Sequence, residues 1–165
     1  MGDLTSAKRL YDKGKAMANS DLISTNDVDL VQARLGLNWG LLLFSKSKLE
    51  EAIKIFSEVI DRCRNEDIKI NNENCKEWIE LMVTSANNLA VCALMGGDPT
   101  HAVKVIELTL QHSMYCNMNV QLIRNLNILY SLLYSPKTAK IKKQVIVDAA
   151  KKYGIDLQTN RQLMI

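Results

Sequence analysis

The residues best able to bind a metal or act as nucleophiles are four cysteines and two histidines. The cysteines stand at positions 63, 75, 92 and 116, so none forms the C-x-x-C pair of a zinc site. His101 and His112 are eleven residues apart, which on a helix is roughly 16 Å of rise. We therefore predict no metal and no cofactor, and we interpret the cysteines in the helical patterns as small apolar residues.

The familiar catalytic motifs do not occur in the sequence. There is no G-x-S-x-G nucleophile turn, no H-E-x-x-H zinc motif and no phosphate-binding glycine loop. Gly96 and Gly97 are explained by a turn. We predict that the protein is not an enzyme, and an enzyme with an unrecognised site is the remote alternative.

Length and composition are those of one soluble globular domain, residues 1–165, with 47% hydrophobic and 24% charged residues. A net charge of +3 is too small to indicate a nucleic-acid partner. We find no run of about 18 apolar residues and no apolar region of a secretory signal, so we expect a cytoplasmic chain without a membrane span.

The hydrophobic period is helical throughout, which predicts an all-α fold of about seven helices. The first helix, 4–18, carries a narrow amphipathic stripe that includes Leu10, Tyr11 and Met17, and this helix should cap the array. The remaining predicted segments are a hairpin at 28–64, an Asn-rich insert at 65–74, a hairpin at 76–113, a degenerate hairpin at 120–153 and a tail at 154–165.

Two helix starts have local signals. Gly96 and Gly97 should end one helix, Asp98 should cap the next, and Pro99 suits its first turn. Ser47 to Glu50 fits a capping box, in which the serine and glutamate side chains bond each other's backbone N–H groups.

The two hairpins share a packing pattern. Each has a small residue in its first helix, an alanine 12 positions later and a large apolar residue 4 positions after that. These residues are Gly40, Ala52 and Phe56 in one hairpin and Ala90, Ala102 and Ile106 in the other. The pattern resembles tetratricopeptide repeats, which implies a solenoid of helical hairpins, an α-α superhelix. The offset of 50 residues exceeds the usual repeat of about 34, and Gly36 and Ala86 replace the large residue expected before the small one.

The second half carries a closer resemblance. Asn87 to Leu94, Gly97, Ala102 to Glu107, Leu126 to Leu132 and the ending with Thr159, Asn160, Gln162 and Leu163 resemble the C-terminal tetratricopeptide region of subunit twelve of the transport protein particle (TRAPP) complex. This resemblance implies a non-catalytic scaffold in vesicle tethering and endoplasmic reticulum-to-Golgi transport, associated with vesicles and held by contacts with other proteins. The family member is longer at its N-terminus, so the chain is either a fragment or a short divergent homologue.

A co-chaperone or other peptide-binding adaptor is the alternative. Tetratricopeptide domains that bind chaperone C-termini use a clamp of Lys, Asn and Arg on their first helices. The corresponding residues here are apolar: Leu37, Leu41 and Val91. A clamp in this chain would lack its charges, which lowers the standing of that alternative.

The first helix of each hairpin should line the concave side of a solenoid. The polar residues expected there are Arg34, Asn38, Asn87, Asn88, Arg124 and Asn127. Asparagines can bond the backbone of an extended peptide, although Asn87 and Asn88 could instead only bridge neighbouring helices. The lysines at 137–152 could meet an acidic partner or an anionic lipid surface, but a solvated helix face is the commoner meaning. Trp39 and Trp78 should pack in the core.

Overall fold

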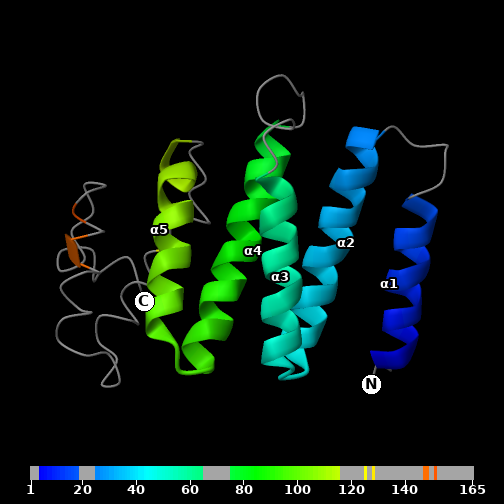
Figure 1. The fold of residues 1–165 in the computed structure, drawn as a ribbon, viewed down its shortest axis with the longest axis horizontal. Coiled ribbons are helices and arrows are strands. Elements are labelled where there is room, and N and C mark those ends of the chain that lie inside the picture. Colours follow the sequence, from blue (N-terminus) through cyan, green and yellow to red (C-terminus); the bar gives the residue numbers. More distant parts are fainter. Residues whose placement is uncertain are drawn as a thin grey trace. The chain divides into compact units, whose positions relative to one another are not determined.

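The computed structural model describes residues 4–18, 25–64, 75–115, 125, 128, 147–148 and 151. Their helices are α1 (Leu4–Ala18), α2 (Thr25–Ser45), α3 (Leu49–Cys63), α4 (Cys75–Met95) and α5 (Pro99–Tyr115), drawn in Figure 1. None of the described residues lies in a β-strand. The prediction of an all-α fold is therefore confirmed for this part of the chain.

The chain divides into two compact units, unit 1 from Met1 to Ser85 and unit 2 from Ala86 to Ile165. The boundary falls inside α4, so the first half of that helix belongs to unit 1 and the second half to unit 2. Each unit is described by itself.

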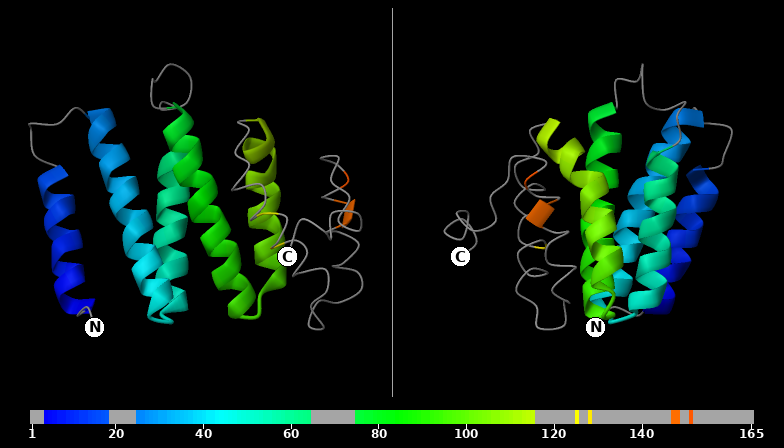
Figure 2. Two further views of the ribbon diagram at one scale, coloured as in Figure 1. Left: turned by 180° about the vertical axis from the view of Figure 1, so that it is seen from behind. Right: turned by 60° about the vertical axis from the view of Figure 1, so that its left-hand side comes forward.

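In unit 1, α2 packs against α1 and against α3, and the views from front and back show these three helices side by side (Figures 1 and 2). Two glycines of α2 let α3 approach closely. A Cβ atom at Gly40 would lie 2.5 Å from Cε1 of Phe56, and one at Gly36 would lie 2.6 Å from Cγ2 of Val59. Phe56 and Val59 are buried, so large side chains of α3 fill the space that the glycines leave.

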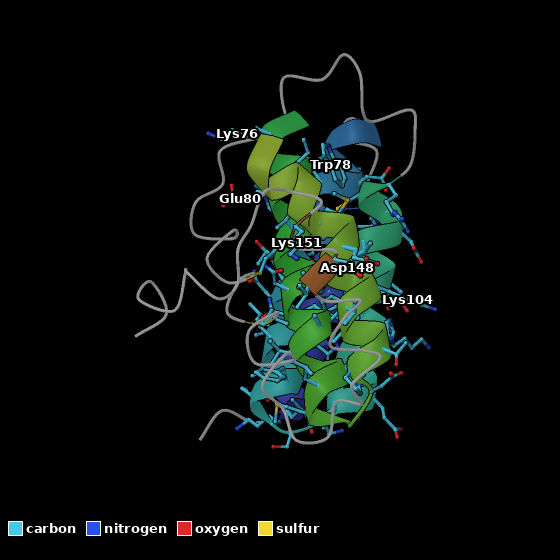
Figure 3. The ribbon with its side chains drawn as sticks, turned by 90° about the vertical axis from the view of Figure 1, so that its left-hand side faces the viewer. Lys76, Trp78, Glu80, Lys104, Asp148 and Lys151 are labelled. Carbon is cyan, nitrogen blue, oxygen red and sulfur yellow. The ribbon has the colours of Figure 1, made fainter. Side chains whose placement is uncertain are left out.

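The tryptophans lie in the interior, as predicted: Trp39 of α2 and Trp78 of α4 are both buried. Figure 3 labels Trp78 together with Lys76 and Glu80, which lie near it on the same helix and are exposed. Arg62 of α3 forms an ion pair of 2.8 Å with Asp29 of α2 and so ties the two helices near one end. Because both side chains remain more than a third exposed, we expect this pair to add little stability.

The turn between α2 and α3 corrects one prediction. Ser47 is not a helix cap but has a left-handed backbone with φ of 59°, and α3 begins at Leu49. The Lys48 N–H donates to the Leu43 carbonyl at 3.0 Å, and the Ser47 N–H donates to Phe44 at 2.9 Å. This is a Schellman ending of α2, with serine where glycine is usual. Lys48 is the N-cap of α3 and makes no side-chain capping bond, so the predicted capping box is wrong.

The turn between α4 and α5 has the same geometry and follows the prediction. Gly97 has φ of +83°, and the Asp98 N–H donates to the Ala93 carbonyl at 2.8 Å. The Asp98 carboxylate accepts a bond of 3.0 Å from the His101 N–H, as a helix cap does. Pro99 is the first residue of α5. The two hairpin turns thus repeat with an offset of 50 residues, Ser47 corresponding to Gly97.

The packing of unit 2 also follows this offset. Ala90 and Ala102 are buried as predicted, and so is Ile106, the counterpart of Phe56. Thr109 stands where α3 has Val59, and its hydroxyl bonds the Val105 and Ile106 carbonyls at 3.4 and 3.3 Å. The same spacing of side chains is therefore buried in both hairpins.

Some predicted segments lie outside the described residues. They are the Asn-rich insert at 65–74, the tail at 154–165 and most of the degenerate hairpin at 120–153. In that last range Asn125, Ile128, residues 147–148 and Lys151 are helical.

Candidate functional site

The open side of α2 carries two of the predicted binding residues. Arg34, Asn38, Leu41 and Ser45 are all exposed, and their spacing of three to four residues places them on one face of the helix. The Arg34 guanidinium forms an ion pair with Glu77 of α4 within unit 1. On this face Asn38 carries a side-chain amide, which can both donate hydrogen bonds to a peptide backbone and accept them from it.

The other predicted asparagines of the first helices lie elsewhere. Asn87 and Asn88 of α4 are 0% and 5% exposed, so in this structure they lie inside the protein and not on an open face. Arg124 and Asn127 lie outside the described residues. The predicted set is therefore not brought together on one surface among the residues that can be placed.

Unit 2 instead contains buried polar groups. The Asn125 Nδ2 donates to Thr109 Oγ1 at 3.4 Å, and both side chains are completely buried. A buried polar group is costly unless it has a partner, so such bonds restrict which helix faces can pack together. We interpret this contact as a packing device and not as a binding site.

A hollow that the sequence analysis missed lies between α1 and α2. Its volume is about 220 Å³, and it is lined by Ala7, Leu10, Tyr11, Leu35, Asn38, Trp39 and Leu42. Leu10 belongs to the apolar stripe of α1 and is nevertheless 64% exposed. Met17, in the same stripe, is 62% exposed. The described residues therefore cover only part of the stripe of α1, and the sequence pattern gives no signal of which part stays exposed.

Two aromatic rings, one from each helix, pack against each other where α1 contacts α2. The Tyr11 and Trp39 rings stack with centroids 5.5 Å apart and an interplanar angle of 16°. The Lys8 ammonium lies 5.3 Å from the Tyr11 ring centre, and the Lys15 ammonium lies 5.5 Å from it, both within cation–π range. Burial raises the pKa of the Tyr11 hydroxyl, and the carboxylate of Glu58 raises it further. The phenol therefore stays protonated at neutral pH.

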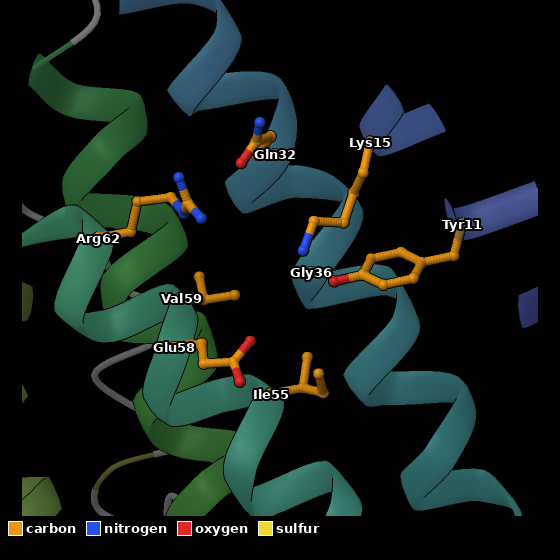
Figure 4. Close-up of a pocket in the computed structure, with 8 residues that line it drawn as sticks. All are labelled: Tyr11, Lys15, Gln32, Gly36, Ile55, Glu58, Val59 and Arg62. Carbon is orange, nitrogen blue, oxygen red and sulfur yellow. The ribbon is translucent and has the colours of Figure 1, made fainter. Parts of the chain in front are cut away.

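A small polar cavity lies on the other side of Tyr11. Figure 4 shows its lining from α1, α2 and α3: Tyr11, Lys15, Gln32, Gly36, Ile55, Glu58, Val59 and Arg62. Its volume is about 10 Å³, which is room for about one water molecule. A substrate would not fit there, although the cavity combines two cations with a carboxylate.

A wider charged hollow adjoins the N-terminal half of α1, with a volume of about 500 Å³. It is lined by Leu4, Thr5, Lys8, Arg9, Asp12, Trp39, Lys48 and Glu51. Lys8 forms an ion pair with Asp12, and Lys48 forms one of 2.7 Å with Glu51. Most of its charges are thus already neutralised by neighbours on the same helices.

The cysteines that the structure describes in side-chain detail behave as apolar residues. Cys63 and Cys92 are buried free thiols, and burial raises their pKa values to about 12 and about 11. Neither would be a thiolate nucleophile at neutral pH. Among the described residues no group of three His, Cys, Asp or Glu side chains could hold a metal ion.

One helix bears on the expectation that the chain has no membrane span. The segment Lys76–Met95 of α4 is long and apolar enough to cross a membrane by length and composition alone. Because 67% of that stretch is buried in the structure, its length and composition are weak evidence for a span.

Comparison of the chain with known protein families, with curated proteins and with solved structures found no match.

Proposed function

We propose that this protein is a non-catalytic scaffold of tetratricopeptide-like helical hairpins that binds other proteins. The observation that carries the proposal is the recurrence of one hairpin geometry 50 residues apart, with matching turns at Ser47 and Gly97. Isolated hairpins cannot bury both faces, so repeated hairpins are typical of stacked arrays whose remaining faces bind partners. On this proposal the full array has about seven helices.

The setting we propose is a vesicle-tethering complex similar to TRAPP, on the cytoplasmic side of endoplasmic reticulum-to-Golgi transport. It rests on the sequence resemblance of Asn87 to Leu94 and of Ala102 to Glu107 to subunit twelve of that complex. A co-chaperone or other peptide-binding adaptor is the second candidate. What favours it is the exposed face of α2, where Asn38 borders an apolar hollow. A third candidate is membrane contact through the 137–152 lysines. Of these lysines only Lys151 is described, and its side chain is exposed.

The test is affinity purification of the full chain from cytosol, followed by mass spectrometry. The informative variant is Arg34→Ala with Asn38→Ala, because both side chains are exposed and their loss should leave the fold intact. We expect wild type to recover tethering-complex subunits and the variant to recover them less well. Dominant recovery of chaperones would favour the adaptor, and failure to recover any stoichiometric protein partner would contradict the proposal.

A further inference from the structure

Two large exposed apolar side chains lie on one helix of unit 1. The large apolar residues that are exposed among the described residues are Leu10, Met17, Leu41 and Met95. Leu10 and Met17 both lie on α1, seven residues apart, which is two turns of one helix face or about 10.5 Å. Leu10 also lines the hollow against α2. Exposed apolar groups gathered in this way mark binding surfaces more than scattered ones do.

The ridge of α1 beside these residues is positively charged. Lys13 is exposed and lies three residues after Leu10 and four before Met17, so it borders both on the helix surface. Arg9 is exposed one turn before Lys13, on the flank of the helix that adjoins theirs. The carboxylate of α1, on Asp12, is already paired with Lys8. None of the ion pairs between described residues includes Arg9 or Lys13. The two cations are therefore available to an external partner, and a guanidinium binds a carboxylate with two parallel hydrogen bonds.

We propose that the α1–α2 seam, formed by Leu10, Leu35, Asn38 and Leu42 and extended along α1 by the exposed Met17, binds an amphipathic helix of a partner protein whose polar side is acidic. Two neighbouring helices leave a groove that accepts a third helix, whose apolar residues at positions i, i+3 or i+4 and i+7 match a two-turn spacing. The carboxylates beside that apolar face then meet Arg9 and Lys13. The inference rests on the proposed function as a protein-binding scaffold and names the chemistry of the partner.

Other occupants fit the surface less well. A nucleic acid would use the cations but gain nothing from Leu10 and Met17. A membrane-bound amphipathic helix needs a broad free apolar face, whereas the Tyr11 side of α1 is stacked on Trp39 and only two large side chains stay exposed. An acidic amphipathic helix uses the apolar and the cationic groups together.

The test uses two synthetic helical peptides with identical leucine positions, one with glutamates on its polar side and one with lysines. Their binding to the full chain is measured by fluorescence anisotropy at low and at physiological salt. We expect the glutamate peptide to bind at least about tenfold more tightly than the lysine peptide, and this preference to shrink as salt rises. Leu10→Ser should weaken binding of the glutamate peptide at least about fivefold. Arg9→Glu with Lys13→Glu should reverse the preference.

Matched controls exist elsewhere in the chain. Met95 is 61% exposed at the end of α4, so Met95→Ser removes a comparable apolar group from another surface. Lys104 of α5 is also exposed (Figure 3), so Lys104→Glu changes a charge on a helix of the other unit. Both controls should leave the affinity within about twofold, a difference of about 0.4 kcal/mol. Circular dichroism should show equal helix content for all variants, because the altered side chains are exposed.

The proposal is overturned if the two peptides bind equally, if neither binds, or if Leu10→Ser has no effect. It is also overturned if the chain binds vesicles of anionic lipid but not the glutamate peptide. A concentration-dependent dimer that Leu10→Ser abolishes would assign the seam to a second copy of the chain instead. If affinity purification recovers partners whose binding depends on Arg34, which lies outside the seam, but not on Leu10, the proposed function stands and the seam proposal fails.

Discussion

Gly40 of α2 offers a sharp test of the packing in unit 1, because an added methyl group has two opposing effects. Alanine favours a helix interior over glycine by about 1 kcal/mol. Against this, a Cβ at position 40 would lie 2.5, 2.9 and 3.0 Å from three atoms of the Phe56 ring. Because Phe56 is completely buried, the ring has no free space into which to move.

The clash should outweigh the helix preference. Overpacking a filled core costs about 1–3 kcal/mol, and three close contacts with one rigid ring place this site toward the upper end. We therefore expect Gly40→Ala to destabilise unit 1 by about 1–2 kcal/mol net. With a urea dependence of about 1.5 kcal/mol per molar, the unfolding midpoint should fall by about 1 M.

Tryptophan fluorescence is the appropriate assay, since the chain has two tryptophans and both, Trp39 and Trp78, belong to unit 1. The control is Gly14→Ala. Its Cβ would lie 3.1 Å from the flexible end of Leu35, so the midpoint should stay or rise. In a Phe56→Leu background, Gly40→Ala should become neutral or stabilising, which a double-mutant cycle measures. A higher midpoint for Gly40→Ala in the wild-type background would refute the close approach of α2 and α3.

Three further predictions concern the turns, the second hairpin and a buried thiol. Ser47→Gly should stabilise unit 1 by about 1 kcal/mol, because glycine adopts the left-handed backbone without strain; an unchanged or lower urea midpoint would contradict this. Ala102→Leu should destabilise the second hairpin by about 1–3 kcal/mol, measured as a lower melting temperature by circular dichroism, and an unchanged melting curve would mean that the repeat register is misassigned. Burial raises the pKa of Cys63 from 9.0 to about 12, so the stability it contributes is complete below pH 9 and is lost as pH rises from 9 toward about 12. Wild type should therefore lose more stability than Cys63→Ala across that range, and equal losses would count against this reasoning.

Local signals predicted one turn and failed at the other for identifiable reasons. Gly97, Asp98 and Pro99 each have a specific backbone preference, so the start of α5 could be located from the sequence. Ser47 has no such preference for a left-handed backbone, and its neighbour Glu50 completed a false capping-box pattern. The conformation of Ser47 is imposed by closure of the hairpin, which sequence spacing does not report.

The candidate site was predicted in part. Periodicity placed Arg34 and Asn38 on one helix, and both are exposed there. It could not show that Asn87 and Asn88 are buried, because polar residues on a helix are usually at the surface and burial depends on what packs against them. For α1, periodicity gave the position of the apolar stripe but not the width that a neighbouring helix covers. Leu10 is exposed because the neighbouring helix covers only part of that stripe.

The sizes of the side chains at corresponding positions of the two hairpins differ in a compensating way, and this has an evolutionary consequence. In the first hairpin a glycine at 40 accompanies a phenylalanine at 56, whereas in the second an alanine at 90 accompanies an isoleucine at 106. In each hairpin a bulkier residue at one position goes with a smaller one at the other, so we expect a change at one to be tolerated only with a compensating change at the other. Among homologous sequences these two positions should covary, and a chimera that moves α3 into the place of α5 should fold poorly unless the facing helix is transplanted with it.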